Sequence, residues 1–189
     1  MLRRIFVVLI TVGLVTIALP ASADHGSITD KTGDATGCGV GKAANCDIVS
    51  ATYGHRSNGR LMHTVTVDGK IGNPNGSGPQ NLPRLYIDVP GQKFDNPTCD
   101  FFIDSLPPGA GPNTTDHYQY YVETCQNTGA QVRGPASATQ VDANTLRIVF
   151  KRKRIGSPGH YGWQFAFPTD GDGAPYDQAP NKGYKRHDI

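Results

Sequence analysis

The fold is decided by residues 48–67, IVSATYGHRSNGRLMHTVTV, in which two alternating segments flank a Ser-Asn-Gly turn. Such turns join neighbouring antiparallel strands. A two-residue turn would align the apolar residues of the second segment with glycine, threonine and serine. A three-residue turn closed by the glycine places Leu61 opposite His55 and His63 opposite Tyr53, which gives both strands an apolar face. We therefore predict a hairpin with the three-residue turn.

The rest of the chain continues this pattern of short alternating segments, with turn residues about every ten positions. No stretch of a dozen residues has a helical period free of Gly and Pro. We predict an all-β fold, a single and mostly antiparallel β-sandwich of about eight strands with long Gly/Pro-rich loops. The predicted strands are residues 48–55, 61–67, 82–89, 101–104, 118–125, 136–141, 145–150 and 161–167, and the long loops are residues 72–83 and 106–115. Trp163 lies on the apolar side of the last strand and is predicted to be a core residue.

Residues 1–23 have the pattern of a signal peptide. Arg3 and Arg4 precede an apolar segment, and a small-residue cleavage site, Ala-Ser-Ala, ends at position 23. The apolar segment is shorter than the ~20 residues of a transmembrane helix. We predict that residues 1–23 are removed, by the general secretory route rather than the twin-arginine route. Residues 24–189 then form one secreted domain with no membrane span, outside the cell or on the exterior of the envelope.

The exported chain is electrically neutral. Without Arg3 and Arg4, the 18 Lys and Arg residues fall to the number of Asp and Glu, which is 16. A neutral chain lacks the positive field that attracts nucleic acid, so we expect no nucleic-acid partner. The one basic cluster is residues 151–154, Lys-Arg-Lys-Arg. It can contact an anionic wall polymer or phospholipid headgroups, although charges at a strand end more commonly block edge pairing.

All four cysteines lie in the exported part of the chain, where an even number indicates disulfides. Three pairings are possible. We favour Cys38–Cys46, which closes a short glycine-rich loop, and Cys99–Cys125, whose members lie on or beside candidate strands.

Acidic residues gather near the two ends of the exported chain: Asp24, Asp30, Asp34 and Asp47, and then Asp170, Asp172 and Asp177. Carboxylates and backbone carbonyls of glycine-containing loops are the oxygen ligands that calcium prefers. Asp and Gly also make ordinary polar turns, which is the simpler interpretation. Our metal-site prediction is a calcium ion bound by Asp30, Asp34 and Asp47.

Four other side chains are candidates for ligand binding. The hairpin register makes His55 and His63 diagonal neighbours, so the two can share a ligand if their rings converge. The simpler interpretation is two half-buried histidines bonded to backbone. Tyr118 and Tyr120 share a strand face, and exposed tyrosine rings can stack on sugars.

A series of short motifs extends over nearly the whole exported chain. The motifs are Asp30-x-x-Gly33-Asp34, Asp47-Ile48, Gly54-His55, Asn58-Gly59-Arg60-Leu61, Leu85-Tyr86-Ile87-Asp88, Tyr161-x-Trp163 and Asp177-x-Ala179-Pro180-x-x-Gly183. Their order resembles a group of small secreted bacterial proteins of unassigned function. That group resembles, in architecture only, carbohydrate-binding and DOMON-type sandwiches. The resemblance implies a domain that binds sugars, haem or calcium.

The sequence contains no serine-hydrolase elbow, zinc-protease motif, phosphate loop or dinucleotide fingerprint. We therefore predict a non-enzymatic ligand-binding or envelope-associated domain, stabilised by calcium and binding a glycan or cell-wall polymer. One alternative is a structural envelope protein with no soluble ligand. Another is a secreted hydrolase that acts on polysaccharide, with Asp100, Asp104 and Glu123 beside the scissile bond.

Overall fold

The computed structural model describes residues 25–92, 99–110, 115–126, 129–169 and 174–189. The predicted signal peptide, Asp24, Asp170, Asp172 and part of the predicted loop 106–115 lie outside the described residues.

The described residues form eleven strands and two short 3-10 helices. The strands are β1 (Gly26–Thr29), β2 (Ile48–Arg56), β3 (Arg60–Val67), β4 (Arg84–Asp88), β5 (Phe101–Leu106), β6 (Gln119–Thr124), β7 (Val132–Asp142), β8 (Thr145–Lys151), β9 (His160–Phe167), β10 (Asp177–Ala179) and β11 (Lys185–Asp188). The helices are η1 (Ala43–Asn45) and η2 (Arg152–Ile155). No helix in the described part of the chain is long and apolar enough to cross a membrane.

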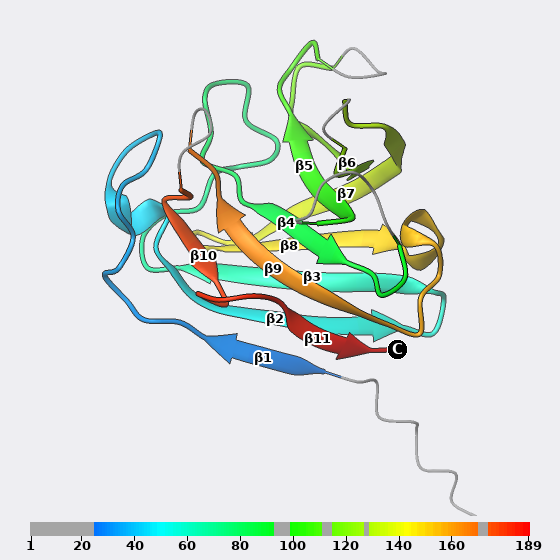
Figure 1. Cartoon of the computed structure of the whole chain (residues 1–189). Coiled ribbons are helices and arrows are strands. Elements are labelled where there is room, and N and C mark those ends of the chain that lie inside the picture. Colours follow the sequence, from blue (N-terminus) through cyan, green and yellow to red (C-terminus); the bar gives the residue numbers. More distant parts are fainter. Residues whose placement is uncertain (1–24, 93–98, 111–114, 127–128, 170–173) are drawn as a thin grey trace, which may run out of the picture.

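The strands form one antiparallel sheet that curves until its two ends approach each other (Figure 1). Its order is β1-β2-β3-β8-β7-β6-β5-β4-β9-β10, and β11 also pairs with β9. Because β7 pairs with β6 on one side and β8 on the other, the two layers of the predicted sandwich are halves of one nearly closed, barrel-like sheet. The all-β, antiparallel prediction is confirmed.

All eight predicted strands are present, and three more occur near the ends of the chain. β1, β10 and β11 have four, three and four residues. Segments of that length are too short to show an alternating pattern. They bring the two edges of the sheet together, and side chains bridge the seam between them: the ring of Tyr53 on β2 lies 4.2 Å from that of His187 on β11.

The central hairpin has the predicted register. Tyr53 pairs with His63 and His55 pairs with Leu61, while Gly59 closes the turn with a positive φ of 71°. The same alternation packs Trp163 fully into the core, as predicted. Both preferred disulfides are present, with Cα–Cα distances of 5.5 Å for Cys38–Cys46 and 5.7 Å for Cys99–Cys125.

Candidate metal centre

Three carboxylates meet at one end of the seam in the sheet. Asp34 follows β1, Asp47 immediately precedes β2, and Asp177 begins β10. One oxygen from each residue lies within 4.8 Å of the other two. We call these three residues the acidic triad. The spacing is close to the ~5 Å that two oxygens span when each lies 2.3–2.6 Å from one calcium ion.

Backbone hydrogen bonds hold two members of the triad in place. The N–H of Gly33 donates to Oδ2 of Asp47 over 2.5 Å, and the N–H of Ile48 donates to Oδ2 of Asp177 over 2.5 Å. The disulfide that ends at Cys46 closes the loop between Asp34 and Asp47. The site is therefore built by loop closure and by a hydrogen bond from the backbone of β2 to a side chain of β10 across the seam.

Three carboxylate oxygens at or beside the site have no hydrogen-bond partner among the described residues. Oδ1 of Asp34, Oδ1 of Asp47 and Oδ2 of Asp30 are buried without a hydrogen bond among the described residues. Asp47 is only 2% exposed. The ion pairs of the described residues join Arg84 to Asp104, His117 to Asp116 and Arg186 to Asp188, so none neutralises the triad. Buried charge of one sign is costly unless it is paired or coordinated to a metal.

The pKa shifts of Asp177 and Asp30 also show that it is costly to bury these charges together. Burial, together with the charges of Asp30 and Asp34, raises the pKa of Asp177 to about 6, although two backbone N–H groups oppose the shift. Burial and the charges of Asp34 and Asp47 likewise raise the pKa of Asp30. Asp177 and Asp30 are harder to ionise because they are buried and lie close to other carboxylates, which is the condition that a divalent cation relieves.

Two of the three predicted calcium ligands belong to the triad, and Asp177 takes the place of the third. Oδ1 of Asp30 accepts hydrogen bonds from the side-chain amide of Asn181 and from the N–H of Lys31. Asp30 therefore lies beside the triad as a neighbouring charge. Asp177 was visible in the sequence as part of the C-terminal acidic group, but nothing there placed β10 beside β2.

His55 and His63 both point inward, but their rings have different partners. Nε2 of His63 lies 2.7 Å from the hydroxyl of Tyr161, which also lies 2.8 Å from Nδ1 of His187. The ring of His55 stacks 5.8 Å from that of His187. His63 is fully buried, and burial, followed by the charge of His187, lowers its pKa well below the usual value. His63 thus belongs to a hydrogen-bonded core cluster, and the acidic triad is the only cluster of three or more potential metal ligands within the described residues.

The two candidate tyrosines occupy different environments. Tyr120 is 4% exposed and belongs to the hydrophobic core, while Tyr118 is half-buried against it. Both contribute to a shallow pocket of about 270 Å³ whose wall also includes His117, Asn75 and Pro135. Tyr118 is therefore the more accessible ring for a ligand.

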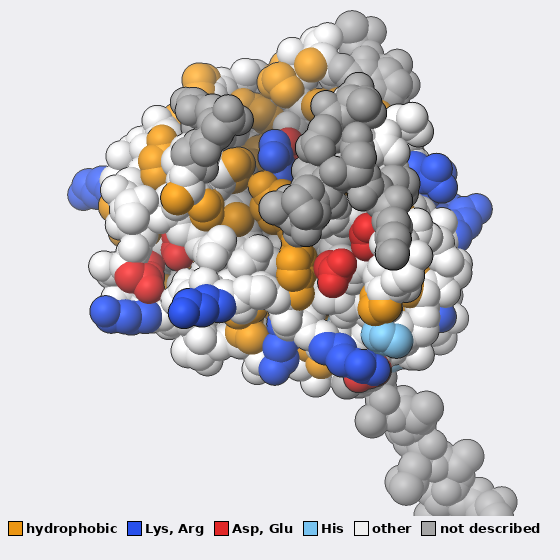
Figure 2. Space-filling view, viewed as in Figure 1, with side chains coloured by type: hydrophobic (Ala, Val, Ile, Leu, Met, Phe, Trp, Pro, Cys, Tyr) orange, Lys and Arg blue, Asp and Glu red, His pale blue; other side chains and the backbone are white. Residues whose placement is uncertain are grey.

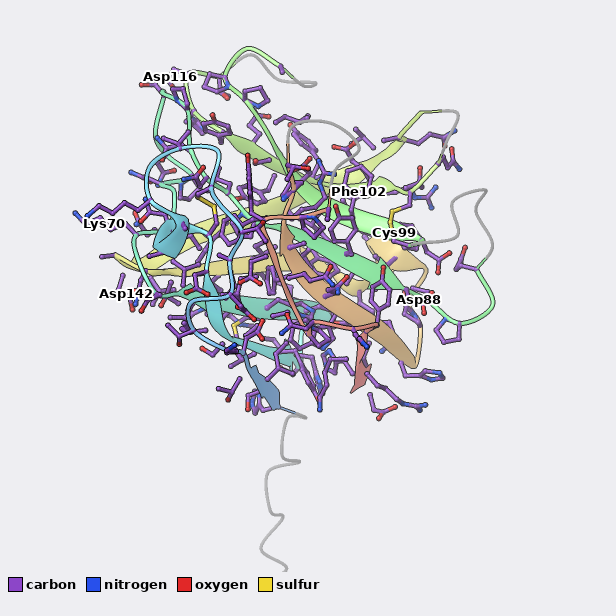
Figure 3. The ribbon with its side chains drawn as sticks, turned by 60° about the vertical axis from the view of Figure 1, so that its left-hand side comes forward. Lys70, Asp88, Cys99, Phe102, Asp116 and Asp142 are labelled. Atoms are coloured by element: carbon purple, nitrogen blue, oxygen red, sulfur yellow. A yellow bond between two sulfur atoms is a disulfide. The ribbon has the colours of Figure 1, made fainter. Side chains whose placement is uncertain are left out.

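The acidic residues of the hydrolase alternative lie on strands β5 and β6 or next to them. Asp104 pairs with Arg84, whose guanidinium lies 4.9 Å from the ring centre of Phe102, labelled in Figure 3. Burial and then Asp104 raise the pKa of Glu123, while Arg84 opposes the shift. Asp100 accepts a hydrogen bond from the N–H of Val89 over 2.7 Å. Asp100 and Asp104 are therefore engaged in interactions that hold the strands together.

Comparisons of this chain with protein-family models, with curated proteins and with solved structures gave no match. The resemblance to secreted sandwich proteins stays a prediction, and the function is argued from the geometry alone.

Proposed function

We propose that this protein is an exported, non-enzymatic binding domain whose fold is stabilised by a calcium ion at the acidic triad. The observation that carries the proposal is the convergence of Asp34, Asp47 and Asp177 within 4.8 Å, with a buried and unpartnered oxygen on Asp47. An exported chain with two disulfides encounters the oxidising, calcium-containing exterior.

The chemistry of the ligands favours calcium over a transition metal. All three side chains are carboxylates, without imidazole or thiolate, and hard oxygen ligands suit calcium, magnesium or manganese. Calcium accepts six to eight oxygens in flexible geometry, whereas magnesium demands a near-ideal octahedron at 2.0–2.1 Å. Loop and strand-end ligands of unequal burial fit the more permissive ion.

The ion would act as a clasp. Its ligands come from the segment after β1, from the start of β2 and from β10, and 129 residues separate Ile48 from Asp177. These carboxylates are near one another only in the folded chain, so the ion binds the native state and stabilises it by mass action.

Isothermal titration of the oxidised protein with calcium and with magnesium tests this proposal. We expect one calcium ion to bind, more tightly than magnesium. Asp177→Asn should abolish binding, whereas the matched control Asp116→Asn, at an exposed residue away from the triad, should bind as the wild type does. Absence of calcium binding, or equal binding by Asp177→Asn, would contradict the proposal.

A glycan is the ligand class that we propose for the domain. The support is the pocket beside Tyr118, where an aromatic ring lies among amide and imidazole groups that can hydrogen-bond to sugar hydroxyls. Retention on an insoluble polysaccharide tests this, with Tyr118→Ala expected to elute earlier. Cleavage of the polysaccharide would instead favour the hydrolase alternative.

A further inference from the structure

The end of the molecule opposite the acidic triad carries a concentration of positive charge. It consists of six cations, which we call the basic end: Arg56, Arg60, Arg133, Lys151, Lys153 and Arg154. They come from the ends of β2 and β8, the starts of β3 and β7, and helix η2. Figure 2 shows Lys and Arg side chains on the side of the molecule where η2 lies in Figure 1.

Strand pairing forces like charges together at this end. Arg56 pairs directly with Arg60, and Arg60 pairs directly with Lys151. Like charges opposite one another across a sheet are destabilising. Within the described part of the chain, no ion pair includes any of these six residues. The contacts among Arg56, Arg60 and Lys151 therefore have a cost that no ion pair of the described residues offsets.

Protection of a sheet edge does not explain the charges. The sequence suggested that residues 151–154 block edge pairing, but only Lys151 belongs to a strand, where it pairs with Arg60 of β3. The other three residues lie in helix η2, which has no strand edge to protect. The side chains of Lys151 and Lys153 are nevertheless exposed, so they remain accessible to a partner.

The cations line two separate hollows. One, of about 190 Å³, is lined by Arg60 and Lys151 together with Pro135 and Ser137. The other, of about 340 Å³, is lined by Arg133, Lys153, Arg154 and Val132. Each is several times the ~30 Å³ of a water molecule, so an anionic group can enter. Nη1 of Arg154 donates to the backbone oxygen of Arg133 over 2.6 Å, while its Nε is buried with no acceptor among the described residues.

We propose that the basic end binds a linear anionic polymer with phosphate groups along its backbone, one group in each hollow. A tetrahedral phosphate presents oxygens in several directions and can accept hydrogen bonds from guanidinium and ammonium groups of different strands at once. This inference goes beyond the proposed calcium site and does not depend on it.

The same surface is a poor match for the other anionic partners. Among the described residues, the exposed large hydrophobic side chains are Val40, Val132 and Val141, and only Val132 lies in the basic end. A membrane-inserting surface needs several such side chains. Neither hollow presents an exposed aromatic ring, as stacking on nucleic-acid bases requires.

The test is titration of the oxidised protein with long-chain inorganic polyphosphate, in calcium-free buffer at a series of salt concentrations. Binding should weaken as salt rises, because neutralised phosphates release counterions. The double variant Arg60→Gln with Lys151→Gln removes both cations of the first hollow, and Arg133→Gln with Lys153→Gln removes two of the three cations of the second. Each should bind about tenfold or more weakly and lower the log–log salt slope by about two.

The matched control removes two exposed lysines outside the basic end, Lys70→Gln with Lys182→Gln, and should bind as the wild type does. The proposal is overturned if polyphosphate does not bind, if the control weakens binding as much as the hollow variants, or if phosphatidylglycerol vesicles bind more tightly than polyphosphate. Separate samples are titrated with calcium. A failure to bind polyphosphate can then be distinguished from a failure to bind calcium.

Discussion

The acidic triad and the basic end lie at opposite ends of strand β2, which begins beside Asp47 and ends at Arg56. Eight residue steps of about 3.3 Å place the two ends of this strand roughly 26 Å apart. The acidic side is mostly buried and assembled from distant segments, whereas the basic side is mostly exposed and built from neighbouring strand ends. The acidic triad and the basic end therefore differ in how much their clustered charges cost in folding stability.

The difference in cost between the two clusters comes from burial. Carboxylates buried without counter-charges destabilise the fold until a cation binds, so the stability of the acidic side depends on a ligand. Exposed cations repel one another through water and salt. The solvent reduces this repulsion to a small fraction of its strength between buried charges. We expect the acidic side to control stability and the basic side to control association.

Asp47→Asn should have the largest effect, because it removes the most buried charge of the triad but retains an acceptor for the N–H of Gly33. In calcium the variant should be less stable than the wild type by about 2–3 kcal/mol, the value for an ion at ~100 times its dissociation constant. In chelator it should be as stable as the wild type or more so. Chemical denaturation in both buffers measures this. A variant equally destabilised in both would indicate that Asp47 is only a backbone acceptor.

Tyr161→Phe changes the core between the acidic triad and the basic end, so its effect on stability serves as a control for both. It removes the hydroxyl shared by His63 and His187, and a buried polar group left without its partner costs about 1–3 kcal/mol. The loss should be the same in calcium and in chelator, and at low and high salt. A calcium-dependent loss in urea unfolding curves would show that the core and the acidic side are coupled.

The pH dependence of stability should differ between chelated wild type and Asp177→Asn. The pKa of Asp177 rises from 3.8 to about 6 on folding, so between these values the folded chain binds a proton that the unfolded chain has lost. Stability should therefore decrease as pH rises through this window, and calcium should reverse the trend. Urea midpoints across the window measure the difference between the two proteins. Identical profiles would contradict the shift.

Arg60→Gln should have the smallest effect on stability, and it should stabilise the protein rather than destabilise it. It removes a like-charge contact on both sides, so stability should rise by a few tenths of a kcal/mol at low salt. High salt should remove the gain, because it screens exposed charges. Thermal midpoints at two salt concentrations measure it. A loss of stability would mean that the arginine contributes more through packing than through repulsion.

Local alternation was sufficient to predict the central hairpin and the burial of Trp163, and the spacing of the cysteines was sufficient to favour the two disulfides. In each of these the deciding information lies within a few residues or in a pairing of adjacent strands. Asp47 was also identified, because it stands immediately before a clear strand. The inward-facing side chain of His63 followed from the register, but its partner Tyr161 lies 98 residues away in the sequence.

The third member of the triad could not be predicted in the same way. Asp177 begins a three-residue strand, which is too short to show periodicity, and its position depends on closure of the sheet. The place of residues 151–154 in the fold could not be predicted for a related reason. Whether a strand lies at the edge or in the interior depends on the strand order of the whole sheet. In this sheet β8 lies between β3 and β7.

The most direct test of the account is thermal unfolding of the oxidised protein after exhaustive chelation, repeated with calcium restored. If the acidic triad is a calcium clasp, the midpoint should rise by roughly 5–10 °C, which is about 2.7 kcal/mol at ~2–4 °C per kcal/mol for a chain of this size. Equal midpoints in the two buffers would contradict the central claim.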